Sequence, residues 1–383
     1  MNRIWLGYLV LVLLSSQSQA STYSEFNAGI SAKGHEKWAD AITHFTAALA
    51  APDFLPAFRA MAYYDRGAAY AETKQWDRAI ADFTDCLKAD PGFLDAYPAR
   101  AGAYGESNHP DLAIADMTTL IARKPFLLGA LAARGAFYVD QKNYPAAIAD
   151  FTALINLKPK LPEGHELRGP VYRITGDLSD AMDDADTALR LNFIKSASDY
   201  ADRGYVYEAK GEYGDAVDDF ETAAGLAPKS FDIRMHLALA YWEDEKFYDA
   251  LKAFTLARDS AKGDLVAYMT IWMSLSAFKA GRPGDDTVKT FAAQDKTTQW
   301  PRPIVDLYSG AGTVDTMVKA ITGSDAQKQA EETCEANFYG GMWQEMHQNV
   351  EAAKAMLSTA AENCPVTFVE RPAAAAERRR LMR

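Results

Sequence analysis

Residues 65–91 read DRGAAYAETKQWDRAIADFTDCLKADP, and the start of this stretch returns further along the chain at a constant interval. The copies read RAGAY at 100–104, RGAFY at 134–138 and RGPVY at 168–172, and RGYVY follows one residue out of step at 203–207. The second half returns in step, with alanine, a large apolar residue and proline at fixed offsets. A period of this length is typical of an array of short helical units.

The recurring residue types are those that two packed helices require. With Gly67 counted as position eight, each first half has a small residue there and tyrosine at position eleven, on the same helical face. Each second half has alanine at position twenty, where helices approach closely, and most copies end in proline, which stops a helix. The glycines at position eight are Gly67, Gly135, Gly169 and Gly204, and the prolines are Pro91, Pro125, Pro159 and Pro228.

This pattern resembles the tetratricopeptide repeat family. Two further copies flank the first five, one with Gly29 and Trp38 before an insertion around 52–56, the other with Ala238 and Tyr241. We therefore predict seven repeats over residues 21–262. The resemblance implies an all-α fold, a right-handed superhelix of helix-turn-helix repeats whose first helices line a concave groove, in a protein that binds other proteins and is not an enzyme.

The period decays after Ala257, so residues 263–383 are predicted to form a degenerate eighth unit, a terminal repeat-like hairpin and a C-terminal helix. The motifs QWPRPIVDLYSG at 299–310, NFYGG at 337–341 and FVE at 368–370 follow one another here. This series resembles the new-lipoprotein-I type of bacterial envelope adaptor. The resemblance implies an adaptor that brings a processing protease and peptidoglycan hydrolases together.

The first twenty residues have the pattern of a secretory signal peptide. Arg3 precedes an apolar run from Ile4 to Leu14, and a polar stretch ends at Ala20. The run is short of the ~20 residues that a membrane-spanning helix needs, which disfavours the alternative of an uncleaved anchor. We expect cleavage after Ala20 and a periplasmic mature chain without a transmembrane segment. It is not lipidated, because no cysteine stands near this site.

The chain is acidic, with a formal net charge of −12. This charge argues against nucleic acid as a partner. It is explained either by solubility or by a groove that prefers basic or neutral ligands. The first repeat has Glu25 and Phe26 in place of a polar cap, and an uncapped end of a repeat array favours association. A homodimer through the N-terminal repeats is therefore expected, alongside protein or peptide partners.

Two of the three cysteines fit one terminal hairpin. If Gly341 occupies position eight, Cys334 falls at position one and Cys364 at position thirty-one, which are neighbours in an antiparallel helix pair. Because an exported chain meets an oxidising compartment, we predict a disulfide between them. Cys86 lies several repeats away and is predicted to be a free, buried residue.

No pattern predicts catalysis, a metal site or a cofactor. The six histidines lack ligand spacing, and no nucleophile elbow, phosphate-binding loop or Cys-x-x-Cys pair is present. One arginine and one aspartate recur in each repeat, which indicates either an anion-binding ladder or, as we favour, structural ion pairs between the two helices. The arginines are Arg66, Arg100, Arg134, Arg168 and Arg203, and the aspartates are Asp82, Asp116, Asp150, Asp184 and Asp219.

The candidate ligand-binding residues lie on the first helices of repeats six and seven. Positions five and nine lack the lysine and asparagine of the carboxylate clamp that some tetratricopeptide proteins use to bind peptide termini. Aromatic, apolar and acidic residues gather on these helices instead. They predict an apolar peptide groove with an acidic rim. The alternative is that their side chains pack against repeat six. The predicted groove residues are Tyr205, Glu208, Met235, Leu239, Trp242 and Glu243.

The resulting hypothesis is a periplasmic adaptor that binds proteins or extended peptides and positions an envelope protease or peptidoglycan hydrolase. A structural organiser of the cell envelope without a peptide ligand is the alternative. An envelope hydrolase is the third possibility and would require a cluster of catalytic residues that the sequence does not show.

Overall fold

The computed structural model describes residues 22–52, 54–282, 286–365 and 368–382. Within these ranges the regular secondary structure is helical throughout. None of the described helices is long and apolar enough to cross a membrane. The signal peptide predicted for residues 1–20 lies outside the described residues and stays a prediction.

Residues 22–34 form the first helix. The helices that follow in the first half are α2 (Trp38–Ala50), α3 (Pro56–Glu72), α4 (Trp76–Ala89), α5 (Ala96–Glu106), α6 (Pro110–Arg123), α7 (Leu128–Asp140), α8 (Tyr144–Leu157), α9 (Glu163–Thr175) and α10 (Leu178–Leu191). Those of the second half are α11 (Ala197–Lys210), α12 (Tyr213–Leu226), α13 (Phe231–Glu243), α14 (Phe247–Arg258), α15 (Leu265–Lys279), α16 (Thr287–Gln294), α17 (Arg302–Ser309), α18 (Val314–Lys319), α19 (Ala326–Met346), α20 (Val350–Asn363) and α21 (Glu370–Leu381).

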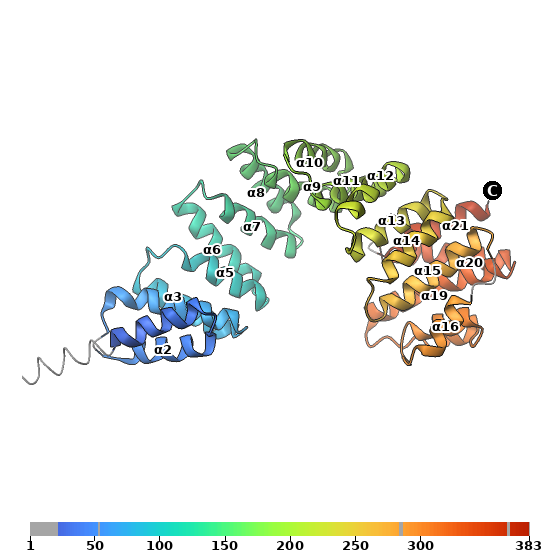
Figure 1. Cartoon of the computed structure of the whole chain (residues 1–383). Coiled ribbons are helices and arrows are strands. Elements are labelled where there is room, and N and C mark those ends of the chain that lie inside the picture. The colour runs from blue at the N-terminus through green and yellow to red at the C-terminus, as the bar shows by residue number, and fades with distance from the viewer. Residues whose placement is uncertain (1–21, 53, 283–285, 366–367, 383) are drawn as a thin grey trace, which may run out of the picture. The chain divides into compact units, whose positions relative to one another are not determined.

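Consecutive helices pack as pairs, and each pair packs on the next, as Figure 1 shows within each half. The prediction of an all-α fold built from helix-turn-helix repeats is confirmed. The chain divides into two compact units, unit 1 over Met1–Leu191 and unit 2 over Asn192–Arg383. This division falls inside the predicted repeat region 21–262, whose boundaries stay a prediction.

Close contact between the two helices of a repeat explains the glycine at position eight. A Cβ atom on Gly67 would lie 2.9 Å from the ring of Phe83, and one on Gly204 would lie 2.9 Å from the ring of Phe220. The terminal hairpin repeats this contact, since a Cβ on Gly341 would lie 2.8 Å from Leu357. The glycine and its partner have the same separation in sequence in each case, so α19 and α20 have the geometry of a repeat.

The turn inside each repeat uses a left-handed backbone at position fifteen. In two repeats this residue is glycine, with φ of 88° at Gly176 and 76° at Gly211. In the other repeats and in the terminal hairpin it is a larger residue with φ between 57° and 64°. These larger residues are Glu36, Lys74, Asn108, Lys142, Glu245 and Gln348. The positive φ at Gln348 supports the same assignment of α19 and α20.

The recurring arginines and aspartates form the predicted structural pairs. Arg100, for example, donates two hydrogen bonds to Asp116, at 2.8 and 2.6 Å. A third goes to the hydroxyl of Thr84 in the preceding repeat, at 3.0 Å. The equivalent arginine-to-threonine bonds are Arg66–Thr46, Arg134–Thr118 and Arg168–Thr152. Since these guanidinium groups are occupied within the fold, the alternative of an anion-binding ladder is not supported.

The largest apolar cluster of the chain lies in unit 2, where the repeats give way to the C-terminal elements. Trp272 of α15 is nearly fully buried and stacks on Phe254 with the ring centroids 5.2 Å apart. The ring centroid of Phe338 in α19 lies 5.3 Å from that of Trp272. Alanines of α21 complete the cluster. The last repeat therefore packs against elements outside the repeat pattern.

Candidate binding sites

Two of the six predicted groove residues lie in the core. Trp242 is fully buried and Leu239 is 5% exposed. The Trp242 ring lies 5.0 Å from that of Trp272 and 5.1 Å from that of Phe247. In this conformation neither Trp242 nor Leu239 can contact a partner, which corrects the expectation for these two side chains. Trp242 packs on α14 and α15, the elements that follow it.

Tyr205 and Glu208 lie together in a polar cluster between α11 and α13. The Tyr205 hydroxyl donates a hydrogen bond to Asp232, and His236 Nδ1 lies 2.9 Å from Glu208 Oε2. The Tyr205 and His236 rings meet edge to face at 4.7 Å. The sequence interpretation missed Asp232 and His236, because neither has a motif around it. Met235 is part exposed beside this cluster. Binding by this surface stays a prediction.

The last predicted residue, Glu243, ends α13 beside the C-terminal helix. Arg380 of α21 donates hydrogen bonds to the carbonyl oxygens of Trp242 and Glu243, at 3.1 and 3.3 Å. These carbonyls belong to the last turn of α13, where a cation is favoured. Arg380 also pairs with Glu245 at 3.2 Å and lies over the Phe247 ring at 5.2 Å. The chain's own arginine thus covers this end of the predicted groove.

Buried charges hold α21 in this place. Glu377 is fully buried, with Lys279 of α15 at 2.5 Å and Arg380 as its second partner. Burial raises the pKa of Glu243 to about 7, although Arg380 acts in the opposite direction. Glu243 Oε2 has no hydrogen-bond partner among the described residues. A carboxylate in this setting is easier to protonate than an exposed one.

A more open pocket lies in unit 1, between repeats two and three. It has a volume of about 430 Å³. Its floor is made by small residues of α5, among them exposed Pro98 and Gly102, and a Cβ on Gly102 would meet no other atom within 4 Å. Two exposed carboxylates, Glu72 and Glu106, stand at its edge, and the Trp76 ring is half-buried beside them. The sequence interpretation placed the groove elsewhere and did not single out this pocket.

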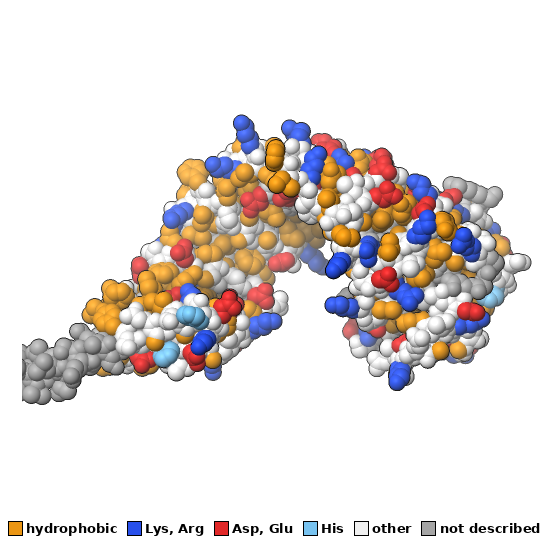
Figure 2. All heavy atoms as spheres, viewed as in Figure 1, with side chains coloured by type: hydrophobic (Ala, Val, Ile, Leu, Met, Phe, Trp, Pro, Cys, Tyr) orange, Lys and Arg blue, Asp and Glu red, His pale blue; other side chains and the backbone are white. Residues whose placement is uncertain are grey.

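Apolar residues with acidic side chains between them extend over the surface of unit 1 beyond this pocket. In Figure 2, hydrophobic atoms are frequent on the face shown over α5 to α7, with acidic side chains between them. Ala132 and Ala136 of α7 occupy positions five and nine and are part or fully exposed. The exposed small residues of the first helices therefore continue beyond the pocket.

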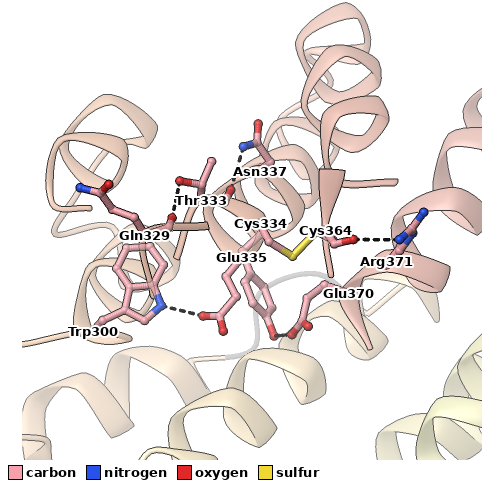
Figure 3. The surroundings of a disulfide bond; sticks show 10 residues. Trp300, Gln329, Thr333, Cys334, Glu335, Asn337, Cys364, Glu370 and Arg371 are labelled. Carbon is pink, nitrogen blue, oxygen red and sulfur yellow. Dashed lines mark hydrogen bonds between the residues drawn. A yellow bond between two sulfur atoms is a disulfide. The ribbon is translucent and has the colours of Figure 1, made fainter. Parts of the chain in front are cut away.

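The predicted disulfide is present. Cys334 of α19 and Cys364 at the end of α20 are bonded, with their Cα atoms 4.9 Å apart, and Cys86 is free and buried. Figure 3 shows this bond with Glu335 beside it, which accepts a hydrogen bond from Trp300 Nε1 at 2.6 Å. Glu335 also accepts a hydrogen bond from the Tyr268 hydroxyl, at 2.6 Å. Burial, and then the nearby Glu370, raise the pKa of Glu335 to about 7. Both the bond and this network join α19 to its neighbours.

The described residues show no arrangement for metal chemistry. Within them, no group of three or more histidine, cysteine, aspartate or glutamate side chains could hold a metal ion. His165 lies 2.7 Å from Asp184, but Arg168 also binds that carboxylate. This histidine is part of a repeat's internal ion pair.

The sequence of two segments matches a known repeat family. Residues 26–92 and 201–264 match the profile of the tetratricopeptide repeat. The chain contains tetratricopeptide repeats. The two matched segments fall on the predicted repeats one and two of unit 1 and six and seven of unit 2. The resemblance of residues 299–381 to the new-lipoprotein-I type is not tested by this match and stays a prediction.

A solved tetratricopeptide structure shares the fold. A tetratricopeptide repeat protein from Parabacteroides merdae is 16% identical with a TM-score of 0.54, covering 67% of this chain and 99% of that chain. A thermophilic one from Thermus thermophilus is 22% identical with a TM-score of 0.39, covering 48% of this chain and 99% of that chain. No curated protein matches the chain. At these identities the likeness concerns the fold alone.

Proposed function

We propose that the protein is a non-catalytic scaffold of the cell envelope that binds proteins or extended peptides on the first helices of its repeats. The observation that carries the proposal is the open pocket between repeats two and three, with small residues on its floor and carboxylates at its edge. Concave, largely apolar surfaces with a few polar groups are typical ligand sites. Small side chains such as Gly102 allow a peptide backbone to approach closely.

The compartment is part of the proposal. The disulfide between Cys334 and Cys364 supports an oxidising environment, since such bonds persist mainly in exported proteins. The predicted signal peptide and the resemblance to envelope adaptors favour the periplasm. Within it, the protein would hold a protease or a peptidoglycan hydrolase next to its substrate. A structural organiser without a peptide ligand remains the alternative.

The test is site-specific photocrosslinking in living cells. A photoreactive residue is placed at exposed Ala136 on α7, and at exposed Ala122 on α6 as the matched control. We expect a covalent adduct from Ala136 and none from Ala122, with the same adduct reformed from the purified protein and the identified partner. Adducts from Ala122 alone, or none from either position, would remove the proposal. Hydrolysis of casein or murein by the purified protein alone would favour an enzyme.

A further inference from the structure

We propose that loops joining consecutive repeats bind the surface of an anionic phospholipid membrane, with Phe126 among the lipids and nearby lysines on the headgroups. The loops in unit 1 are residues 124–127, between repeats three and four, and residues 158–162, between repeats four and five. The inference goes beyond the proposed function, because it assigns a second surface made of residues other than those of the pocket at Trp76.

Phe126 is exposed at a position where the fold needs no large side chain. It follows the end of α6 and is 79% exposed. It occupies position thirty-three of its repeat, where the neighbouring repeats have Gly92 and Lys160. Phe93, at position thirty-four, is different, because its ring packs on that of Tyr64 with the centroids 5.0 Å apart. The exposed ring of Phe126 is therefore not explained by packing within the array.

Further apolar side chains lie next to Phe126. Leu127 is 40% exposed, and Leu161, at the equivalent position of the next loop, is 42% exposed. Loops of this kind lie side by side along the array, since Arg123 at the end of α6 donates a hydrogen bond to the carbonyl of Pro91 in the preceding loop. Single exposed apolar residues are common on protein surfaces, whereas a group of them marks a place of interaction.

The same loops carry positive charge in an acidic chain. Segments 122–128 and 156–162 contain four basic residues and no acidic one, although the formal net charge of the chain is −12. Three of the four are exposed lysines without an ion-pair partner in the part of the chain that the structure describes, namely Lys124, Lys158 and Lys160. The turns at the opposite ends of the helices have acidic residues instead, namely Glu106, Asp140 and Asp177. The charge of this edge is therefore complementary to an anionic surface.

An anionic membrane accounts for both kinds of residue. Lysines close to such a membrane are attracted to its headgroups over about a Debye length. Apolar side chains between them can enter the boundary of headgroups and acyl chains. A protein partner would instead bury its main contacts in a pocket of matching shape. Because Phe126 projects from a loop, a deformable lipid surface can bind it without a pocket.

Unit 2 begins with a loop of the same composition. Phe193 is 100% exposed, Ile194 is 83% exposed, and exposed Lys195 follows them. Ile194 occupies position thirty-three, as Phe126 does, and residues 187–198 include no acidic residue. Each unit thus has an exposed apolar pair beside lysine in a loop that joins repeats, so we expect both loops to contribute to lipid binding.

The test is sedimentation of the purified protein with vesicles of phosphatidylcholine alone or mixed equally with phosphatidylglycerol. We expect binding to the mixed vesicles, reduced by salt, and little binding to phosphatidylcholine. Phe126→Ser combined with Phe193→Ser should weaken binding at least about tenfold. Ile174→Ser is the matched control, since Ile174 is 51% exposed at the opposite end of its repeat, and it should leave binding unchanged.

The lysines are tested in the same way. Lys158→Gln combined with Lys160→Gln should weaken binding to the mixed vesicles about tenfold. Lys74→Gln combined with Lys142→Gln removes the same charge from the turns inside repeats and should have little effect. Equal losses from the two pairs would show that net charge alone, and not this edge, attracts the membrane.

Insertion of the loop has its own readout. An environment-sensitive fluorophore on Phe126→Cys should report a less polar surrounding when mixed vesicles are added, and one on Ile174→Cys should not. Cys86 is buried, so it does not compete for the label in the folded protein. An unchanged signal from Phe126→Cys would contradict insertion.

Several further results would overturn the proposal. Binding of the double phenylalanine variant as tight as that of the unchanged protein would do so, and both side chains are exposed, so this variant keeps its fold. So would equal binding to the two kinds of vesicle. A change in mass by light scattering on Phe126→Ser would assign the surface to a second copy, and a photoreactive residue at Phe126 that crosslinks to a protein in cells would assign it to a protein partner. The adduct expected from Ala136 does not depend on these results.

Discussion

The pocket beside Trp76 and a smaller pocket of about 130 Å³ beside Tyr213 have aromatic and acidic residues at the same repeat positions, yet α21 covers only the second. In unit 1 the glutamate is exposed and the floor is open. In unit 2 the glutamate is largely buried, its pKa is raised, and an arginine binds the end of the helix that carries it. The comparison teaches that the same repeat positions are open in one unit and covered in the other, and that elements outside the repeats make the difference.

The largest effect should come from removing the disulfide between α19 and the end of α20, just before α21. Replacing Cys334 and Cys364 together by alanine opens a loop with a sequence separation of 30 residues, which should cost roughly 3 to 4 kcal/mol in the stability of unit 2. Hydrogen exchange should be faster in α19 to α21. The pocket beside Tyr213, which α21 now covers, should become more exposed to solvent. Reduction of the unchanged protein should give the same result, whereas Cys86→Ala should not. Unaltered exchange in α21 would mean that the helix stays bound without the bond.

The second expected effect is that the stability of unit 2 depends on pH. The pKa of Glu335 is about 7 in the folded chain and near 4.5 when unfolded, so the folded state binds the proton more tightly. The stability that protonation of Glu335 gives to the folded state is fully present below about pH 4.5. It is lost as the pH rises to 7, and the loss is up to about 3 kcal/mol. Urea unfolding at pH 5 and pH 8 measures it, and Glu335→Gln should reduce the difference. A stability that rises over this range, and does so equally in the variant, would contradict the assignment.

A smaller effect is expected from the arginine that covers Glu243. Arg380→Ala leaves the carbonyls of Trp242 and Glu243 without this donor and removes one partner of buried Glu377, which should cost about 2 kcal/mol. Arg378→Ala is the control, because its pair with Glu362 is more exposed and should contribute only ~0 to 1 kcal/mol. Thermal unfolding compares the two. Equal losses would show that Arg380 does not hold α21.

The smallest expected effects are in the turns. Gly211→Ala places a side chain at φ 76° and should cost about 1 kcal/mol in unit 2. Lys142→Gly, at φ 59° in unit 1, should relieve a similar strain but gain less than ~1 kcal/mol, because glycine also loses more entropy on folding. Denaturant midpoints of the two variants should move in opposite directions. A shift of both midpoints in the same direction would mean that the positive φ at these positions does not determine the stability change.

The regular features could be predicted because they follow from counting positions. The pairing of Arg100 with Asp116, the contact of Gly341 with Leu357 and the disulfide all depend on residues that return at fixed spacing. Packing of small against large side chains leaves few other arrangements for such a pattern. The internal ion pairs were therefore predictable without any homologue.

The candidate sites were less predictable, because they depend on elements outside the period. Nothing around Trp242 shows in sequence that Trp272 will cover it, since α15 belongs to no clear repeat. Likewise, the sequence around Arg380 does not reveal that it binds the end of α13, which lies several helices earlier in the chain. The pocket at Gly102 was missed for the opposite reason: a ligand site made of small residues looks like ordinary helix packing until the exposed surface is known.

The threonine bound by four of the recurring arginines, Arg66, Arg100, Arg134 and Arg168, makes this part of the array modular. Arg100 takes its hydroxyl partner from the preceding repeat and its carboxylate from its own, and Arg134 does the same. If residues 100–133 were excised, Thr84 would face Arg134 at the spacing at which it now faces Arg100. Whole units of this kind can thus be lost or duplicated without leaving a guanidinium unpaired, so the length of the array can change while each repeat keeps its internal contacts.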